Sequence, residues 1–85
     1  MSADTYRIAT TTAYKYLRSI FTGEQEKGDF VLKKLGNTFC IFHLFSQYRV
    51  ERLVITISSK YITVRPMREM EDTIQNAFDT FGIQL

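Results

Sequence analysis

The sequence contains only one cysteine, one histidine and one proline, and it has no apolar run long enough to span a bilayer. A lone cysteine, Cys40, excludes an internal disulfide, which favours a cytoplasmic or nuclear setting. We expect the cytoplasm. A membrane-spanning helix needs about 20 consecutive apolar residues, so we do not expect an integral membrane protein. The segment 1–9 includes Asp4 and Arg7 and lacks an apolar core, which argues against a secretory signal.

The residue types that most often carry catalysis are also few and scattered. Cys40 and His43 stand three apart in an expected strand, so their side chains point to opposite faces, whereas a Cys–His nucleophile or a metal site needs them to converge. The four glycines, at positions 23, 28, 36 and 82, fall in expected loops or at a helix end and form no phosphate-binding loop. We therefore expect a protein that is not an enzyme and that holds no metal and no cofactor.

Charge is unevenly distributed along the chain. The net charge at pH 7 is +2, yet all eleven lysines and arginines lie within the first 68 residues, which contain five acidic residues and so carry +6. The last 17 residues contain four acidic residues and no base, which gives −4. Either the acidic C-terminal segment partly neutralises a basic body, or a basic surface is left for an acidic partner.

Length and apolar spacing predict one α+β domain over residues 1–85. Its 85 residues are too few for two independent cores, and 45% hydrophobic residues is ordinary for a folded domain. Apolar residues recur at spacings of three and four over 11–22 and 66–81, which predicts two amphipathic helices. Gly82 followed by Ile83 predicts a left-handed cap at the end of the second helix.

Between the helices the pattern predicts two antiparallel hairpins. Segments 30–35 and 38–45 are joined by Gly36-Asn37, a pair that suits a two-residue primed turn and places Leu35 opposite Thr38. In the second hairpin, Leu53, Ile55 and Ile57 are expected on an aliphatic face. They alternate with Arg52, Val54, Thr56 and Ser58 on a mostly polar face, and the loop at residues 59–60 pairs Ile57 with Ile62.

The remaining segments are less specific. Residues 5–9 fit either a short edge strand or the first turns of a helix, and the polar segment 23–28 fits a solvated loop. The expected architecture is a two-layer sandwich of helix, four-stranded antiparallel meander and helix, with a further N-terminal strand if residues 5–9 are extended.

Both faces of the first hairpin are apolar, so the sequence leaves open which one the helices cover. The face turned away from them presents one of two sets: Lys33, Val31, Cys40, Phe42 and Leu44, or Lys34, Phe30, Phe39, Ile41 and Phe45. Large apolar side chains on an uncovered face would meet water unless a homodimer, a partner protein or a ligand covers them.

This uncovered face is the expected functional surface. Arginine beside aromatic residues is enriched where proteins bind each other, and seven residues are candidates for partner binding: Arg52, Tyr61, Arg65, Thr56, Thr63, Lys33 and Phe42. A short chain without linker, tail or motif fits a regulator, inhibitor or accessory subunit that binds another protein or a second copy of itself. The alternative is a nucleic-acid-binding domain that uses the basic and aromatic residues of the same face, and a third, weaker interpretation is an enzyme completed by another subunit.

Overall fold

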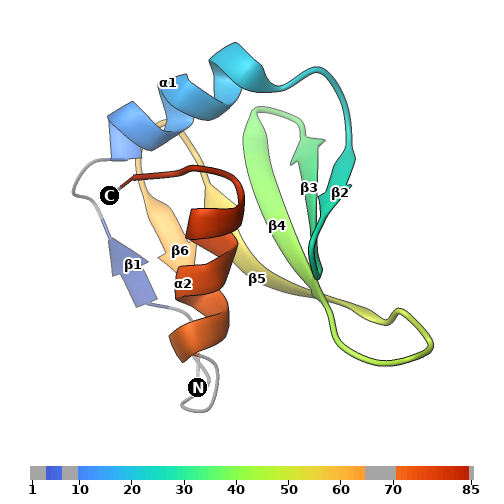
Figure 1. Cartoon of the computed structure of the whole chain (residues 1–85). Helices are drawn as coiled ribbons and strands as arrows, with labels where there is room; N and C mark the ends of the chain where they lie inside the picture. Colours follow the sequence, from blue (N-terminus) through green and yellow to red (C-terminus); the bar gives the residue numbers. More distant parts are fainter. Residues whose placement is uncertain (1–3, 7–9, 65–70, 85) are drawn as a thin grey trace.

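The computed structural model describes residues 4–6, 10–64 and 71–84 of the chain. Within these ranges a six-stranded antiparallel sheet packs against two helices (Figure 1). In chain order the elements are β1 (Asp4–Tyr6), α1 (Thr10–Ile20), β2 (Gln25–Lys27), β3 (Phe30–Leu35), β4 (Thr38–Leu44), β5 (Glu51–Ile57), β6 (Ile62–Val64) and α2 (Glu71–Thr80). The sheet order is β1-β6-β5-β4-β3-β2, so β2 to β6 form a meander and β1 is added at its edge beside β6. The predicted α+β architecture is confirmed.

Both helices pack on the same face of the sheet. Figure 1 shows α1 crossing the end of the sheet and α2 lying in front of β5 and β6. The two helices and one face of the strands contribute to a single core cluster, whose members include Ala13, Leu17, Phe30, Leu32, Phe39, Ile41, Ile55, Ile57, Ile62, Ala77 and Phe78. Within the described ranges, neither helix has the length and hydropathy needed to cross a membrane.

The registers of both predicted hairpins are confirmed. β3 pairs with β4 from Phe30 opposite His43 to Leu35 opposite Thr38, and β5 pairs with β6 through Ile57 opposite Ile62. At the first turn, Gly36 has a φ of 63° whereas the φ of Asn37 is not positive, which is the pattern of a type II′ turn.

The helices cover the face that carries Phe30, Leu32, Phe39 and Ile41. Phe39 is fully buried, and the rings of Tyr14 and Phe21 from α1 contact its ring edge-on, each with a centroid separation of 5.5 Å. This set contains more large apolar side chains than the alternative set on β3 and β4, so more apolar area is removed from water when the helices cover it. The set with Lys33, Val31, Cys40 and Phe42 is left on the other face.

A β-bulge in β5 corrects the predicted alternation of that strand. Ile41 lies opposite Ile55 but Phe42 lies opposite Leu53, so Val54 is an extra residue without a partner in β4. Val54 is 1% exposed and belongs to the core, whereas the period-2 pattern predicted it on the polar face. The extra residue shifts the alternation by one, so the predictions for Leu53 and Arg52 are also wrong: Leu53 lies on the uncovered face and Arg52 opposite His43 on the helix side.

The structure also tests the predictions for residues 23–28, for the N-terminal segment and for the first helix. The segment expected to be a solvated loop contains β2, which pairs with β3 and adds an exposed edge strand. The N-terminal segment forms strand β1 over Asp4–Tyr6, which resolves the choice between strand and helix, and residues 7–9 lie outside the described ranges. The first helix spans Thr10–Ile20, close to the predicted 11–22, while the predicted start of the second helix at residue 66 lies outside the described residues.

The predicted cap at the end of α2 is confirmed. Gly82 has a φ of 70°, the amide of Ile83 donates to the carbonyl of Phe78 at 2.9 Å, and the amide of Gly82 donates to Asp79 at 3.1 Å. These two bonds define a Schellman motif. A side chain at Gly82 would also meet α1, because an added Cβ would lie 2.8 Å from the hydroxyl of Tyr16.

Candidate functional site

The face of the sheet turned away from the helices is called the open face here. Its middle row runs across four strands and consists of Lys33, Cys40, Thr56 and Thr63, each directly opposite the next. The adjoining row consists of Val31, Phe42 and Leu53. The register therefore brings together four of the predicted site residues, Lys33, Phe42, Thr56 and Thr63.

Most apolar side chains of the open face are covered by its own residues. Val31 is 3% exposed and Cys40 is 5% exposed, although both described helices lie on the other side of the sheet. The ammonium Nζ of Lys33 lies 4.9 Å from the ring centroid of Phe42 and 2.8 Å from the carboxylate Oε1 of Glu51. The hydrogen bond to Glu51 raises the pKa of Lys33. The open face therefore exposes less apolar surface than the sequence predicts.

The only cysteine and the only histidine lie on opposite faces, as their spacing predicts. Burial on the open face raises the pKa of the Cys40 thiol, which favours the unreactive protonated form. His43 lies on the helix side between the rings of Phe30 and Phe45, with centroid separations of 5.3 and 6.3 Å. Among the described residues no group of three His, Cys, Asp or Glu side chains is placed to hold a metal ion.

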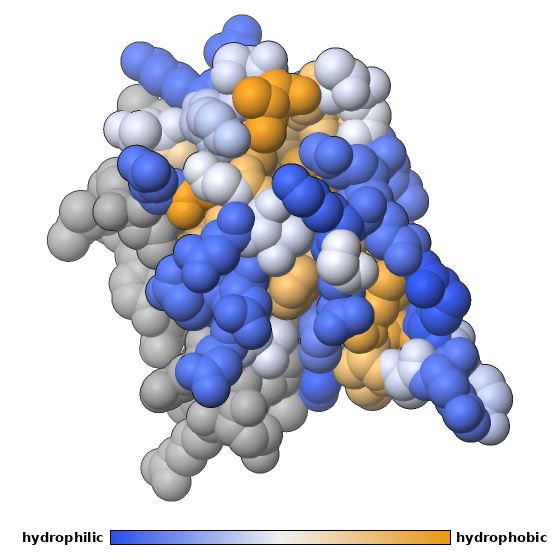
Figure 2. All heavy atoms as spheres, in the orientation of Figure 1, coloured by the Kyte–Doolittle hydropathy of each residue, from blue (hydrophilic) through white to orange (hydrophobic). Residues whose placement is uncertain are grey.

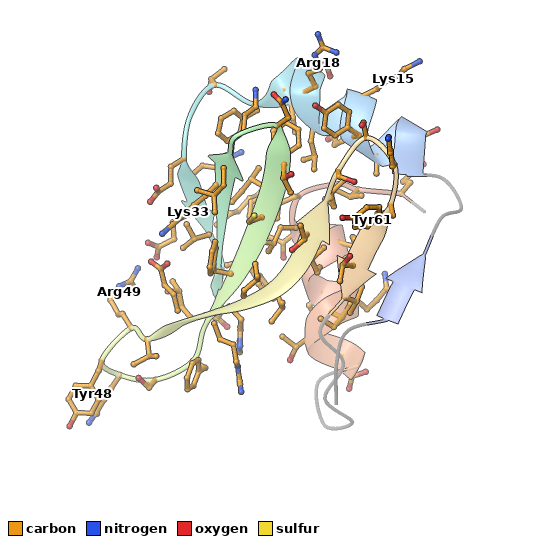
Figure 3. All side chains as sticks on the ribbon, turned by 180° about the vertical axis from the view of Figure 1, so that it is seen from behind. Lys15, Arg18, Lys33, Tyr48, Arg49 and Tyr61 are labelled. Carbon is orange, nitrogen blue, oxygen red and sulfur yellow. The ribbon has the colours of Figure 1, made fainter. Side chains whose placement is uncertain are left out.

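The three other predicted site residues are not all on the open face. Tyr61 follows the turn after β5 and precedes the buried Ile62, so it lies on the open-face side at the end of the sheet (Figure 3). Arg52 lies on the helix side, where the carbon Cζ of its guanidinium is 4.4 Å from the ring centroid of Phe45. Arg65 lies outside the described residues.

The most exposed large hydrophobic side chain among the described residues lies in the connection between β4 and β5, residues 45–50, called the hairpin tip. Other exposed large hydrophobic side chains, Tyr16, Ile20, Leu35 and Tyr61, lie outside it. Tyr48 is 80% exposed, Val50 46% and Phe45 39%. The connection projects beyond the rest of the molecule, with Tyr48 at its far end (Figures 1 and 3). Figure 2 shows hydrophobic surface where this projection leaves the body on the helix side.

Several contacts fix the backbone of the hairpin tip. The amide of Phe45 donates to the carbonyl of Val50 at 3.1 Å, and the amide of Arg49 donates to the carbonyl of Ser46 at 2.9 Å. The hydroxyl of Ser46 accepts from the amide of Tyr48 at 3.1 Å. Arg49 has a φ of 57°, in the left-handed region that non-glycine residues seldom occupy, and its guanidinium forms an ion pair with Glu26 of β2. The hydrogen bond to Glu26 raises the pKa of Arg49.

The hairpin tip was not among the sites predicted from the sequence, although the sequence contains a signal for it. Surface turns are usually rich in glycine, proline, asparagine and aspartate, because these residues favour turn geometry. The segment 45–50 contains none of these four residue types, and Ser46 is its only other common turn former. It also includes three large apolar or aromatic residues, Phe45, Tyr48 and Val50, in a position where the sequence predicts a surface turn.

Among the described residues, the hairpin tip contains the most exposed large hydrophobic side chain, Tyr48, while Val31 and Cys40 of the open face are buried. Compared with known proteins, the chain matches no protein family, no curated protein and no solved structure.

Proposed function

We propose that this chain is a small non-enzymatic protein–protein interaction domain, a regulator, inhibitor or accessory subunit, that docks its hairpin tip into an apolar pocket of another protein. The observation that carries the proposal is the 80% exposure of Tyr48 at the end of a projecting hairpin, with Phe45 and Val50 also exposed beside it. Tyrosine is enriched among the residues that dominate binding energy, and clustered exposed apolar residues mark contact sites.

The fixed backbone of the hairpin tip supports this role. Binding is weakened by the entropy lost when flexible segments become ordered, so a preorganised loop binds more tightly than a mobile one. Here the hydroxyl of Ser46 holds one side of the turn and the Arg49–Glu26 ion pair ties the other side to the neighbouring edge strand. A left-handed residue such as Arg49 costs stability, and this cost is typical of loops with a functional role.

The shape of the hairpin tip favours a different protein over a second copy as the partner. A two-fold homodimer formed through this feature would place the same convex projection against itself. A projecting tyrosine instead requires a concave apolar pocket, which a different chain supplies in this proposal. The proposed setting is the cytoplasm, and the single buried thiol of Cys40 is compatible with reducing conditions.

Site-specific photo-crosslinking in the source cell tests this proposal. A photoreactive amino acid is placed at Tyr48, and in a matched control at Asn37, which is exposed in the β3–β4 turn at the opposite end of the sheet. The proposal predicts a discrete adduct with one other protein from position 48 and none from position 37. Crosslinking between two copies of the chain would show a homodimer and overturn the assigned partner. Equal labelling from the two positions, or no adduct from position 48, would overturn the docking role of the hairpin tip.

A further inference from the structure

We infer that the end of the molecule formed by α1 and two hairpin turns binds single-stranded nucleic acid, with phosphates held by four basic side chains and a base stacked on Tyr61. This surface, called the basic end, consists of Lys15, Arg18, Lys34, Lys60 and Tyr61. It lies apart from the hairpin tip, so the inference does not depend on the function proposed above.

The register places the basic end in one region of the fold. Phe39 lies opposite Lys34 on one side and Ile57 on the other, and Ile57 lies opposite Ile62, so the β3–β4 and β5–β6 turns leave the sheet at the same end. Helix α1 packs at this end, because its Tyr14 and Phe21 contact the ring of Phe39. The Nζ atom of Lys34 lies 5.7 Å from the centroid of that same ring, which places Lys34 beside α1.

The charge of this region has one sign. Residues 10–21, 34–38 and 58–61, which form α1 and the two turns, contain four bases and no acidic residue. In the part of the chain that the structure describes, none of these four bases forms an ion pair, whereas Lys33 and Arg49 are each paired with a glutamate. Glu24, which follows α1, is an acidic residue near these segments in the chain, and its charge contributes to raising the pKa of Lys33. A group of bases without carboxylate partners attracts a polyanion and releases its counterions on binding.

Tyr61 is the feature that favours single-stranded nucleic acid over other polyanions. Its side chain is 43% exposed and directly follows Lys60 in the β5–β6 turn. Figure 3 shows Lys15 and Arg18 pointing outward from α1, with Tyr61 at the adjoining end of the sheet. Aromatic rings beside phosphate-binding bases stack on unpaired nucleobases, whereas a duplex keeps its base faces stacked inside.

Fluorescence anisotropy with a labelled 12-nucleotide oligo(U), measured across a salt series, tests the inference. Each phosphate contact contributes a slope of about −0.7 to log K against log salt for single strands, so three to four contacts predict a slope between about −2 and −3. Lys60→Glu should weaken binding and reduce the slope, whereas Lys27→Glu, the same charge change on β2, should leave both unchanged. Tyr61→Ala should weaken binding about 5-fold or more and Tyr61→Phe should not, because the phenylalanine ring still stacks.

Thermal melts first show that each variant is folded, which the exposure of Lys27, Lys60 and Tyr61 predicts. No binding at low salt, or equal effects of Lys60→Glu and Lys27→Glu, would overturn the inference. Equal affinity for oligo(U) and for a 12-base-pair duplex, together with no effect of Tyr61→Ala, would also overturn it. So would tighter binding to anionic vesicles or to an acidic peptide than to oligo(U). Tyr48→Ser should bind oligo(U) like the wild type, so a failure here is distinguishable from a failure of the proposed hairpin docking.

Discussion

Replacing Gly36 with valine tests the turn that sets the register of the sheet. Gly36 has a φ of 63°, and a Cβ added to it would meet no atom within 4 Å, so the cost is one of backbone conformation and not of a clash. A left-handed conformation costs a residue with a side chain roughly 1–2 kcal/mol, and a β-branched residue is among the least tolerant. An 85-residue domain has a total stability of roughly 4–13 kcal/mol, so this loss is readily measured.

Circular dichroism melts of purified variants give the required comparison. A loss of 1 kcal/mol lowers the Tm of a domain of this size by about 4–8 °C, so Gly36→Val should lower it by about 4–16 °C. Asn37→Val is the matched control, because Asn37 lies in the same turn but its φ is not positive; its Tm should stay close to that of the wild type. Equal melting of Gly36→Val and the wild type would refute the turn geometry and the register that depends on it.

Three further predictions concern the core, the helix cap and the buried thiol. Phe78→Ala removes a 3% exposed ring of α2 and should lower the free energy of unfolding by about 3–5 kcal/mol in a denaturant titration; a variant that unfolds like the wild type would contradict packing of this ring in the core. Gly82→Ala should destabilise the domain, and less so in a Tyr16→Phe background that lacks the contacting hydroxyl; strictly additive effects in the double-mutant cycle would argue against this contact. Cys40 should be alkylated much more slowly in the native than in the unfolded chain. Because burial raises the pKa of the Cys40 thiol in the folded chain, its contribution to the free energy of unfolding should be lost as pH rises above the unfolded-state pKa of about 8.5. Alkylation of the native chain at the rate of the unfolded chain would show that the thiol is not buried.

The elements that could be predicted from the sequence are those whose signals are local. The two-residue turn at Gly36 fixes the pairing of β3 with β4 because the turn itself sets the register. The cap at Gly82 and Ile83 follows from the left-handed backbone that glycine allows. Each of these predictions depends on a few adjacent residues and requires no knowledge of the tertiary packing.

The elements that were missed depend on contacts between distant segments. The bulge at Val54 arises because burial of an extra apolar residue outweighs regular alternation, and a strict period-2 reading of β5 cannot include it. β2 is a three-residue polar strand whose pairing is provided by β3, so its sequence resembles a loop. The covered face of the first hairpin was ambiguous because both faces are apolar, and packing against the two helices decides between them.

In the candidate site, too, local signals could be predicted and contacts between distant segments could not. The predicted hairpin registers place Lys33 opposite Cys40 and Thr56 opposite Thr63, as the structure has them. That these two pairs form one row depends on the pairing of β4 with β5, which the sequence left open. Arg52 was misplaced because the bulge lies between it and the turn from which the register was counted. The degree to which Lys33 covers Phe42 could not be read from the register, because it depends on the ion pair with Glu51 from a strand that is not adjacent to β3.

The most direct test of the proposed docking role is the affinity of the crosslinked partner for wild-type protein and for Tyr48→Ala, measured by isothermal titration calorimetry. Loss of a dominant interface residue costs about 2 kcal/mol or more, so Tyr48→Ala should raise the Kd by about 30-fold or more. Tyr61→Ala, an exposed tyrosine outside the hairpin tip, is the matched control and should bind the partner with the wild-type Kd. A Kd of Tyr48→Ala within a few-fold of the wild type, or an equal loss in both variants, would contradict docking through the hairpin tip.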